Sequence, residues 1–361
     1  MDTLTQNSVK PSKEEMKELR RYYSKMALIL IVLIGVFSGV NTLVMRISCG
    51  IIGGGFDADS LAAGREAVKA DPVMSAMYSY MFPLAGDIAA LLVGLAVTKI
   101  DLKKLFTVKG FDGKDIFNMM AFGFGLPVIA SFLMVAITTL AETAMGRETE
   151  ADDLVRILSA NGPFWLKIFT YAYMCVLGPI MEELIFRGVL LAGLRKYGNV
   201  FAVVMSSVMF GLAHMSFVQC LPAMTVGFVC AVMVIRTGSI LPSMFLHIVN
   251  NSVSAILMIM MQGVDLQKMM DASASYDMDA MMSMFSSLLP ILIFLMINGF
   301  IRLAALVYSL IRAFIFRSRR GTLFGHSDWC TARTWKPCFT SIPMLFIRGY
   351  LLVETVLTIV Q

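Results

Sequence analysis

The feature that most constrains this chain is a series of long stretches with few charged residues. They run from 19 to 39 residues, and the longest, Tyr197–Ile235, holds 39 residues without Asp, Glu, Lys or Arg. About 20 consecutive apolar residues are enough to cross the hydrocarbon core of a bilayer as a helix. Across the chain 15% of residues are charged, against about a quarter in soluble domains. The sequence therefore predicts an integral membrane protein, and it excludes collagen-like, disulfide-stapled and disordered chains.

Reading the apolar runs as helices predicts an all-α polytopic membrane protein with about eight transmembrane helices. The longest run is too long for one span, and we divide it near Gln219–Pro222 because proline disfavours helix continuation. The first run begins too late and is too long for a typical cleaved signal peptide, so we expect it to be retained. The predicted spans are Met26–Val44, Met74–Thr98, Ile116–Leu140, Tyr171–Leu194, Val200–Val218, Leu221–Ile235, Ile240–Gln262 and Ser287–Tyr308.

Basic residues gather in alternate loops. Lys and Arg precede the first span and follow the second, fourth and eighth, whereas the loops after the third and seventh spans are acidic. The positive-inside rule then predicts a cytoplasmic N-terminus. The chain divides into a cytoplasmic N-terminal segment (1–25), the first three spans (26–160), a membrane core (161–316) and a basic tail (317–361). The tail carries a ninth apolar segment, Ile342–Val360, which is either a span or an interfacial or disordered tail.

The fourth span carries three ionisable residues, Glu182, Glu183 and Arg187. A charge at the centre of a membrane helix costs about 2.5–3.5 kcal/mol even on the lenient insertion scale, so such residues are functional candidates. Glu183 and Arg187 are four residues apart and are predicted to pair on one helix face. Glu182 points about 100° away and can face another element. The alternative interpretation is a structural ion-pair network that ties helices together.

Histidines occur in two further spans. Phe210 and His214 are four residues apart in the fifth, as are His247 and Asn251 in the seventh. At 1.5 Å per residue all of them, with Glu182, lie within a hydrocarbon core of about 30 Å and can converge. A lone histidine in an apolar helix is more often a packing residue, but here both accompany a glutamate pair. The residue types indicate water activation by a general base and an oxyanion held by hydrogen-bond donors.

The three motifs, Glu-Glu-x-x-x-Arg, Phe-x-x-x-His and His-x-x-x-Asn, resemble in order the pattern of a known family. It is the CAAX-protease and bacteriocin-processing family (CPBP or Abi family) of intramembrane endopeptidases, which includes the type II CAAX prenyl endopeptidases. The resemblance covers about Pro163–Gln262, with 32 residues from Glu182 to His214 and 33 from His214 to His247. It implies a catalytic set of Glu182, Glu183, His214, His247 and Asn251, with Glu183 and Arg187 also a structural ion pair.

By the same resemblance, Glu182 is the catalytic carboxylate, His214 shares its water, and His247 with Asn251 stabilises the oxyanion. The family is commonly labelled metalloprotease, and Glu182, His214 and His247 would then be the ligands of a zinc ion. A metal-free glutamate mechanism is the other alternative, so the cofactor is either none or Zn²⁺. We favour the metal-free mechanism because His247 and Asn251 supply an oxyanion hole without a Lewis acid.

The resulting hypothesis is a multi-pass intramembrane endopeptidase of the cell membrane. Short loops and the lack of organelle signals favour a bacterial plasma membrane. The expected partners are the lipid bilayer and a membrane-associated protein or peptide, either prenylated or a bacteriocin or pheromone precursor. The alternatives are a non-catalytic immunity or scaffold protein, and a transporter, disfavoured because no duplicated half is visible. No continuous basic surface indicates nucleic-acid binding, and the six cysteines form no disulfide framework or Cys-x2-Cys pair.

Overall fold

The computed structural model describes residues 41–108, 112–145, 163–195, 198–214, 216–261 and 278–315, with Val264 and scattered positions between 12 and 28. Within these ranges every regular element is a helix. The prediction of an all-α polytopic membrane protein is confirmed, because five described helices are long and apolar enough to cross a membrane. These are Pro72–Thr98, Gly113–Leu140, Phe217–Thr237, Leu241–Met261 and Met281–Ala313.

The other three predicted spans differ from one another. Most of Met26–Val44 lies outside the described residues, and the helix that contains its end, α2 (Asn41–Gly53), continues past Val44 because the single charge of Arg46 does not interrupt a helix. The fourth span lies within an unbroken helical run from 164 to 194. The fifth corresponds to α11 (Asn199–Ala213), which at 1.5 Å per residue is only about 22 Å long. The count of eight and the cytoplasmic N-terminus stay predictions.

The predicted division of the longest apolar run at Gln219–Pro222 is wrong in its position. The chain leaves α11 after Ala213, and α12 (Phe217–Thr237) contains Pro222. The helix start is set by Ser216, whose hydroxyl accepts a hydrogen bond from the backbone N–H three residues on, at 3.4 Å. Serine is a strong N-cap residue, and it overrides the proline as the local signal. The basic tail, its segment Ile342–Val360, nearly all of the N-terminal segment and most of both acidic loops lie outside the described residues.

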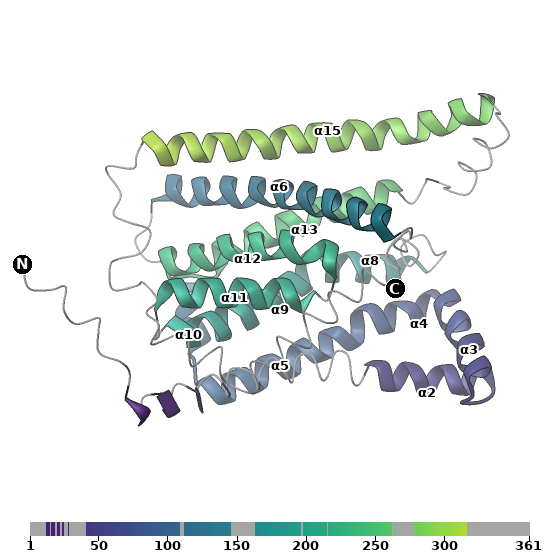
Figure 1. Cartoon of the computed structure of the whole chain (residues 1–361), viewed down its shortest axis with the longest axis horizontal. Helices are drawn as coiled ribbons and strands as arrows, with labels where there is room; N and C mark the ends of the chain where they lie inside the picture. Colours follow the sequence, from purple (N-terminus) through teal and green to yellow (C-terminus); the bar gives the residue numbers. More distant parts are fainter. Residues whose placement is uncertain are drawn as a thin grey trace, which may run out of the picture.

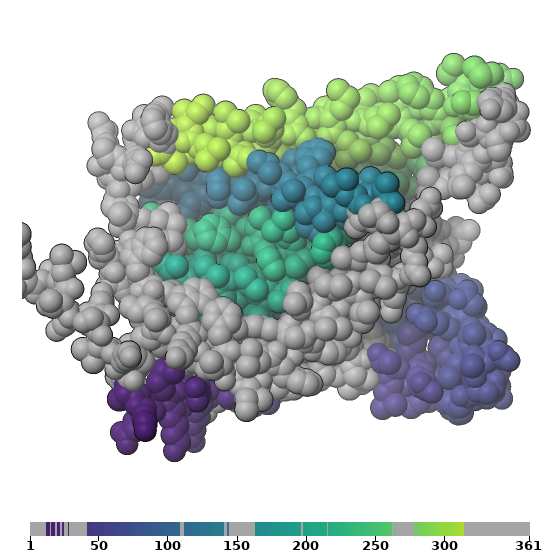
Figure 2. Space-filling model, in the orientation of Figure 1, coloured from purple at the N-terminus to yellow at the C-terminus, as the bar shows by residue number. Residues whose placement is uncertain are grey.

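The helices lie roughly side by side in layers (Figure 1). One outer layer is α15 (Met278–Ile315), which packs along α6 (Gly113–Met145), and α6 packs in turn on α12. Figure 2 shows α15 and α6 as adjacent bands on the surface, with α2 and its neighbours forming a separate end of the molecule. The chain continues from α2 through α3 (Ala58–Ala70), α4 (Pro72–Ala76) and η2 (Met77–Met81) into α5 (Phe82–Thr98).

The main core lies where the helical run 164–194 meets α5, α11 and α12. Seven of the eight residues of η5 are buried, and Val189, Leu190, Phe201 and Met209 are 0% exposed. This run brings the predicted fourth span into the centre of the bundle. Its parts are α8 (Phe164–Ala172), η4 (Tyr173–Leu177), α9 (Gly178–Glu183), η5 (Leu184–Leu191) and α10 (Ala192–Leu194).

Candidate active site

A buried ion pair forms the base of the site. Arg187 Nη1 lies 3.2 Å from Glu183 Oε1, one helical turn away, and both side chains are 0% exposed. The Arg187 guanidinium carbon also lies 4.2 Å from the centroid of the Phe210 ring, a cation–π arrangement. The run 164–194 therefore carries its two most buried charges as a local pair, covered by an aromatic face from α11.

Glu183 also contacts the predicted third motif, on α13 (Leu241–Met261). Its Oε1 lies 3.2 Å from His247 Nδ1. A carboxylate paired with arginine only accepts hydrogen bonds, so Nδ1 carries the proton and donates. The other ring nitrogen, Nε2, lies 3.5 Å from Glu182 Oε2. His247 thus lies between two neighbouring carboxylates of α9, and Glu183 fixes the orientation of the imidazole ring.

Glu182 differs from its neighbour in its environment. Its side chain is 29% exposed, whereas the side chain of His247 is 4% exposed. Its Oε2 is buried and has no hydrogen-bond partner among the described residues. Glu182 is therefore the more accessible of the two neighbouring carboxylates.

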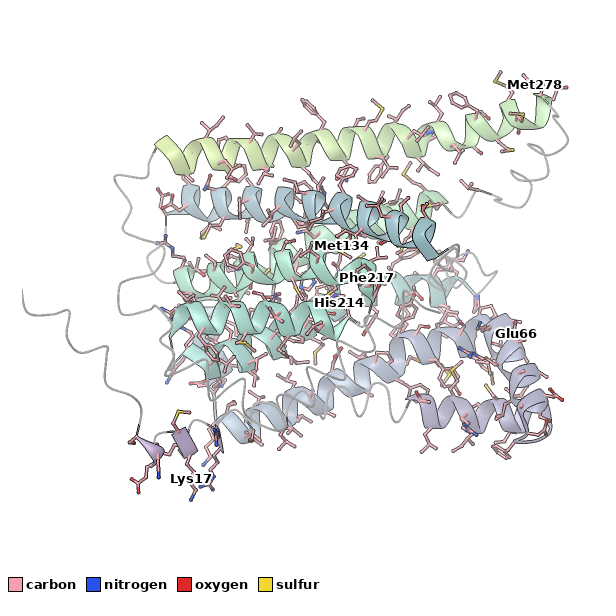
Figure 3. All side chains as sticks on the ribbon, viewed as in Figure 1. Lys17, Glu66, Met134, His214, Phe217 and Met278 are labelled. Carbon is pink, nitrogen blue, oxygen red and sulfur yellow. The ribbon has the colours of Figure 1, made fainter. Side chains whose placement is uncertain are left out.

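His214 lies at the end of α11, in the middle of the bundle (Figure 3). Its Nδ1 is 2.9 Å from the Phe210 carbonyl oxygen, which only accepts, so Nδ1 donates and Nε2 of the neutral ring is an acceptor. The Phe210 ring lies edge-to-face with both His214 and His247, at centroid distances of 4.9 and 5.5 Å. The direct partner of Glu182 is His247, and within the described residues Glu182 and His214 make no hydrogen bond or ion pair with each other.

Asn251 is held by the backbone of η4. Its Nδ2 donates to the Met174 carbonyl oxygen at 3.1 Å. In a π-helix this carbonyl would accept from the residue five positions on, but that residue is Pro179, which has no N–H. The proline therefore frees an acceptor, and Asn251 uses one of its two amide hydrogens to satisfy it. The second amide hydrogen is available to another acceptor.

Two intramembrane charges were missed by the sequence analysis, although each is the single charged residue of its predicted span. Asp87 on α5 is 8% exposed and interacts electrostatically with Glu182. Arg302 on α15 is 7% exposed, and its Nη1 donates to Asn250 Oδ1 at 3.0 Å. A charged residue alone in an apolar span was the signal available for both.

The proposed zinc ligands do not form a three-residue group in this arrangement. Within the ranges that the structure describes, no three His, Cys, Asp or Glu side chains lie close enough together to hold a metal ion. Glu182 and His247 are in contact, whereas His214 directs its ring to Phe210. The residues present therefore supply two of the three ligands that a zinc site of this type needs.

Comparison with known proteins agrees with the motifs. Residues 163–253 match a family model described as "Type II CAAX prenyl endopeptidase Rce1-like". This segment is Rce1-like. The resemblance to type II CAAX prenyl endopeptidases is thus confirmed over about a quarter of the chain. The Rce1-like segment begins beside α8 and ends within α13, so it holds all seven motif residues and leaves out Asp87 and Arg302.

A curated relative adds a second, shorter match. The chain is 30% identical over 114 residues to a Bacillus subtilis (strain 168) protein named "Putative membrane peptidase YdiL". The match covers 31% of this chain and 45% of that relative, so the chain spans less than half of the relative's length. No solved structure matches the chain.

Proposed function

We propose that this chain is an intramembrane endopeptidase that hydrolyses a peptide bond in a membrane-associated protein or peptide. The observation that carries the proposal is the contact between Glu182 and His247, backed by the buried Glu183–Arg187 pair. The Rce1-like match and the B. subtilis relative named as a membrane peptidase support the same activity. The bacterial source of that relative supports a bacterial plasma membrane.

The proposed reaction uses Glu182 as general base and then as general acid. Glu182 takes a proton from a water molecule that His214 Nε2 orients, and the resulting hydroxide attacks the scissile carbonyl carbon. His247, protonated at Nε2, donates to the developing oxyanion together with the second amide hydrogen of Asn251. Glu182 then returns its proton to the leaving amine as the C–N bond breaks. Glu183 acts through His247, because it holds Nδ1 and so directs Nε2 to the reacting atoms.

A non-catalytic scaffold or immunity protein is the rival function. A scaffold would use the buried Glu183–Arg187 pair, but it gives no reason for a second carboxylate that is 29% exposed and contacts the same histidine. The environment of Glu182 therefore favours the enzyme.

Comparative proteomics of membrane peptides tests the function and needs no identified substrate. Cells that contain the active chain are compared with cells that contain Glu182→Gln, a change that keeps the shape of the side chain and removes the base. We expect a set of membrane-associated peptides, prenylated or derived from secreted precursors, to be shortened only with the active chain. Identical peptide profiles in the two strains at equal protein levels would favour the scaffold.

Metal dependence is tested on the detergent-purified, active chain. We expect elemental analysis to find no stoichiometric metal and prolonged phenanthroline treatment to leave turnover unchanged, because His247 and Asn251 supply the oxyanion donors themselves. One zinc per chain, with chelator inhibition reversed by added zinc, contradicts this expectation. That result would assign Glu182, His214 and His247 to the metal and leave the endopeptidase proposal intact.

A further inference from the structure

A second polar cluster lies between α13, α6 and α15, and only its α13 residues belong to the Rce1-like segment. Its centre is Arg302 of α15, whose guanidinium reaches both α6 and α13. Nη1 donates to the Phe124 carbonyl oxygen at 3.2 Å and to Asn250 Oδ1 at 3.0 Å. Nε donates to Asn298 Oδ1 at 3.2 Å, and the guanidinium carbon lies 4.3 Å from the centroid of the Phe124 ring.

Asn250 transmits this contact to α13. Because arginine only donates, the amide oxygen must face Arg302, and the amide nitrogen then faces carbonyl oxygens. Nδ2 lies 3.1 Å from the Leu246 carbonyl oxygen of its own helix and 3.4 Å from the Gly123 carbonyl oxygen of α6. One arginine therefore sets the orientation of an asparagine that joins three helices.

The close approach of the helices depends on two glycines of α6. A Cβ on Gly123 would lie 2.4 Å from Leu246 Cδ2, and a Cβ on Gly125 would lie 2.4 Å from the Arg302 carbonyl oxygen. At Gly125 the obstacle is backbone, so the backbone of α15 lies close to α6, whereas at Gly123 the obstacle is the end of the Leu246 side chain of α13. This proximity brings the Phe124 and Gly123 carbonyl oxygens within reach of the cluster.

The cluster and the candidate active site share the rotation of α13. His247 and Asn251 are one turn apart and face α9 and η4, as their contacts with Glu182 and the Met174 carbonyl oxygen demonstrate. Asn250 lies on the adjoining flank, one residue before Asn251, and is fixed by Arg302. We propose that Arg302 is a positioning residue, which through Asn250 holds α13 in the rotation that presents His247 and Asn251 to the substrate. This inference rests on the proposed endopeptidase function.

A footprint of His247 tests the positioning role without any substrate. The detergent-purified full chain is treated with diethyl pyrocarbonate, and modification of His247 is followed by mass spectrometry with His214 as internal reference. His247 is 3% exposed and both ring nitrogens face carboxylates, so modification of the wild-type chain is slow. We expect several-fold faster modification in Arg302→Met, and slow modification again in Arg302→Gln, which restores an N–H donor.

The matched control is Arg312→Met. Arg312 also joins α15 to α6, through a contact of 3.3 Å between its Nη2 and Asp115 Oδ1, but that contact does not involve α13. Its replacement should leave the His247 footprint unchanged. Equal modification of His247 in Arg302→Met and in the wild type overturns the proposal, and so does the same change in Arg312→Met, which would indicate general loosening of the bundle.

Turnover provides the second readout, on a peptide whose cleavage depends on Glu182. Arg302→Met should lower kcat about 10²-fold with KM nearly unchanged, because a misplacement of about 1 Å at reacting groups has an effect of that size. Arg302→Met alone leaves Asn250 without its arginine and should lower the thermal unfolding temperature. Arg302→Met combined with Asn250→Leu removes both polar partners, so it should be more stable than Arg302→Met but should keep the low kcat. Wild-type kcat in the double variant contradicts the positioning role. If no membrane peptide is found whose cleavage depends on Glu182, the endopeptidase proposal fails instead, and the footprint result stands independently of it.

Discussion

Glu182→Gln is expected to lower the rate of peptide cleavage by about 10²–10⁴-fold, the usual contribution of a general base. The amide keeps the size of the side chain but cannot take a proton from water or deliver one to the leaving amine. The rate is measured with purified chain and a peptide found by the membrane comparison. Asp115→Asn is the matched control, since Asp115 is a carboxylate at the α6–α15 contact, and this variant should cleave normally.

The same assay examines the two histidines. His214→Ala removes the acceptor that orients the water, and His247→Ala removes an oxyanion donor, so both variants should be nearly inactive while the protein stays folded. Full activity in His214→Ala would exclude the proposed water site. Full activity in His247→Ala would exclude the oxyanion role, and with it the reason for the buried Glu183 contact.

Arg187→Met is expected to be the most damaging substitution for folding. It leaves Glu183 charged at 0% exposure without its arginine, and breaking a buried pair costs about 3–5 kcal/mol in soluble proteins. We expect little Arg187→Met in the membrane fraction and a lowered thermal unfolding temperature in detergent. Glu183→Gln combined with Arg187→Met should recover much of the accumulation, because the double variant buries no unpaired charge and keeps an acceptor for His247.

Normal accumulation and insertion of Arg187→Met would contradict the stabilising role of the ion pair. The control is Lys69→Met, since Lys69 pairs with Glu66 at the surface of α3 at 3.9 Å, and such exposed pairs contribute about 0–1 kcal/mol. The comparison therefore separates burial of the charge from simple loss of a cation.

Helical spacing was sufficient to predict the contacts made within one helix or along one face. The pairing of Glu183 with Arg187 follows from their separation by four residues, and the shared face of His247 and Asn251 follows in the same way. The spans were located by the scarcity of charged residues, which is a property of the sequence itself. These features depend on local geometry, so a single sequence carries them.

Contacts between helices could not be read in this way. Nothing in the spacing says that Glu182 meets His247 rather than His214, or that Arg302 reaches across α6 to Asn250. The Asn251 contact depends on a carbonyl that Pro179 frees in a π-helical turn, and a sequence pattern does not reveal where π turns occur. The chain breaks where Ser216 caps the start of α12, and Pro222 lies inside that helix. A capping residue and a proline both mark helix boundaries, and the sequence alone does not say which of the two decides.

The two buried arginines also differ in what they require during synthesis. Arg187 finds its partner Glu183 one turn earlier in the same helix, so these two charges can enter the bilayer as a neutral pair before the rest of the bundle exists. Arg302 has no such partner on its own helix beyond the neutral Asn298, and its other acceptors belong to α6 and α13. Both of those helices precede α15 in the chain, and chains emerge N-terminus first. Arg302, which depends on acceptors from other helices, is thus inserted after α6 and α13 have already entered the membrane.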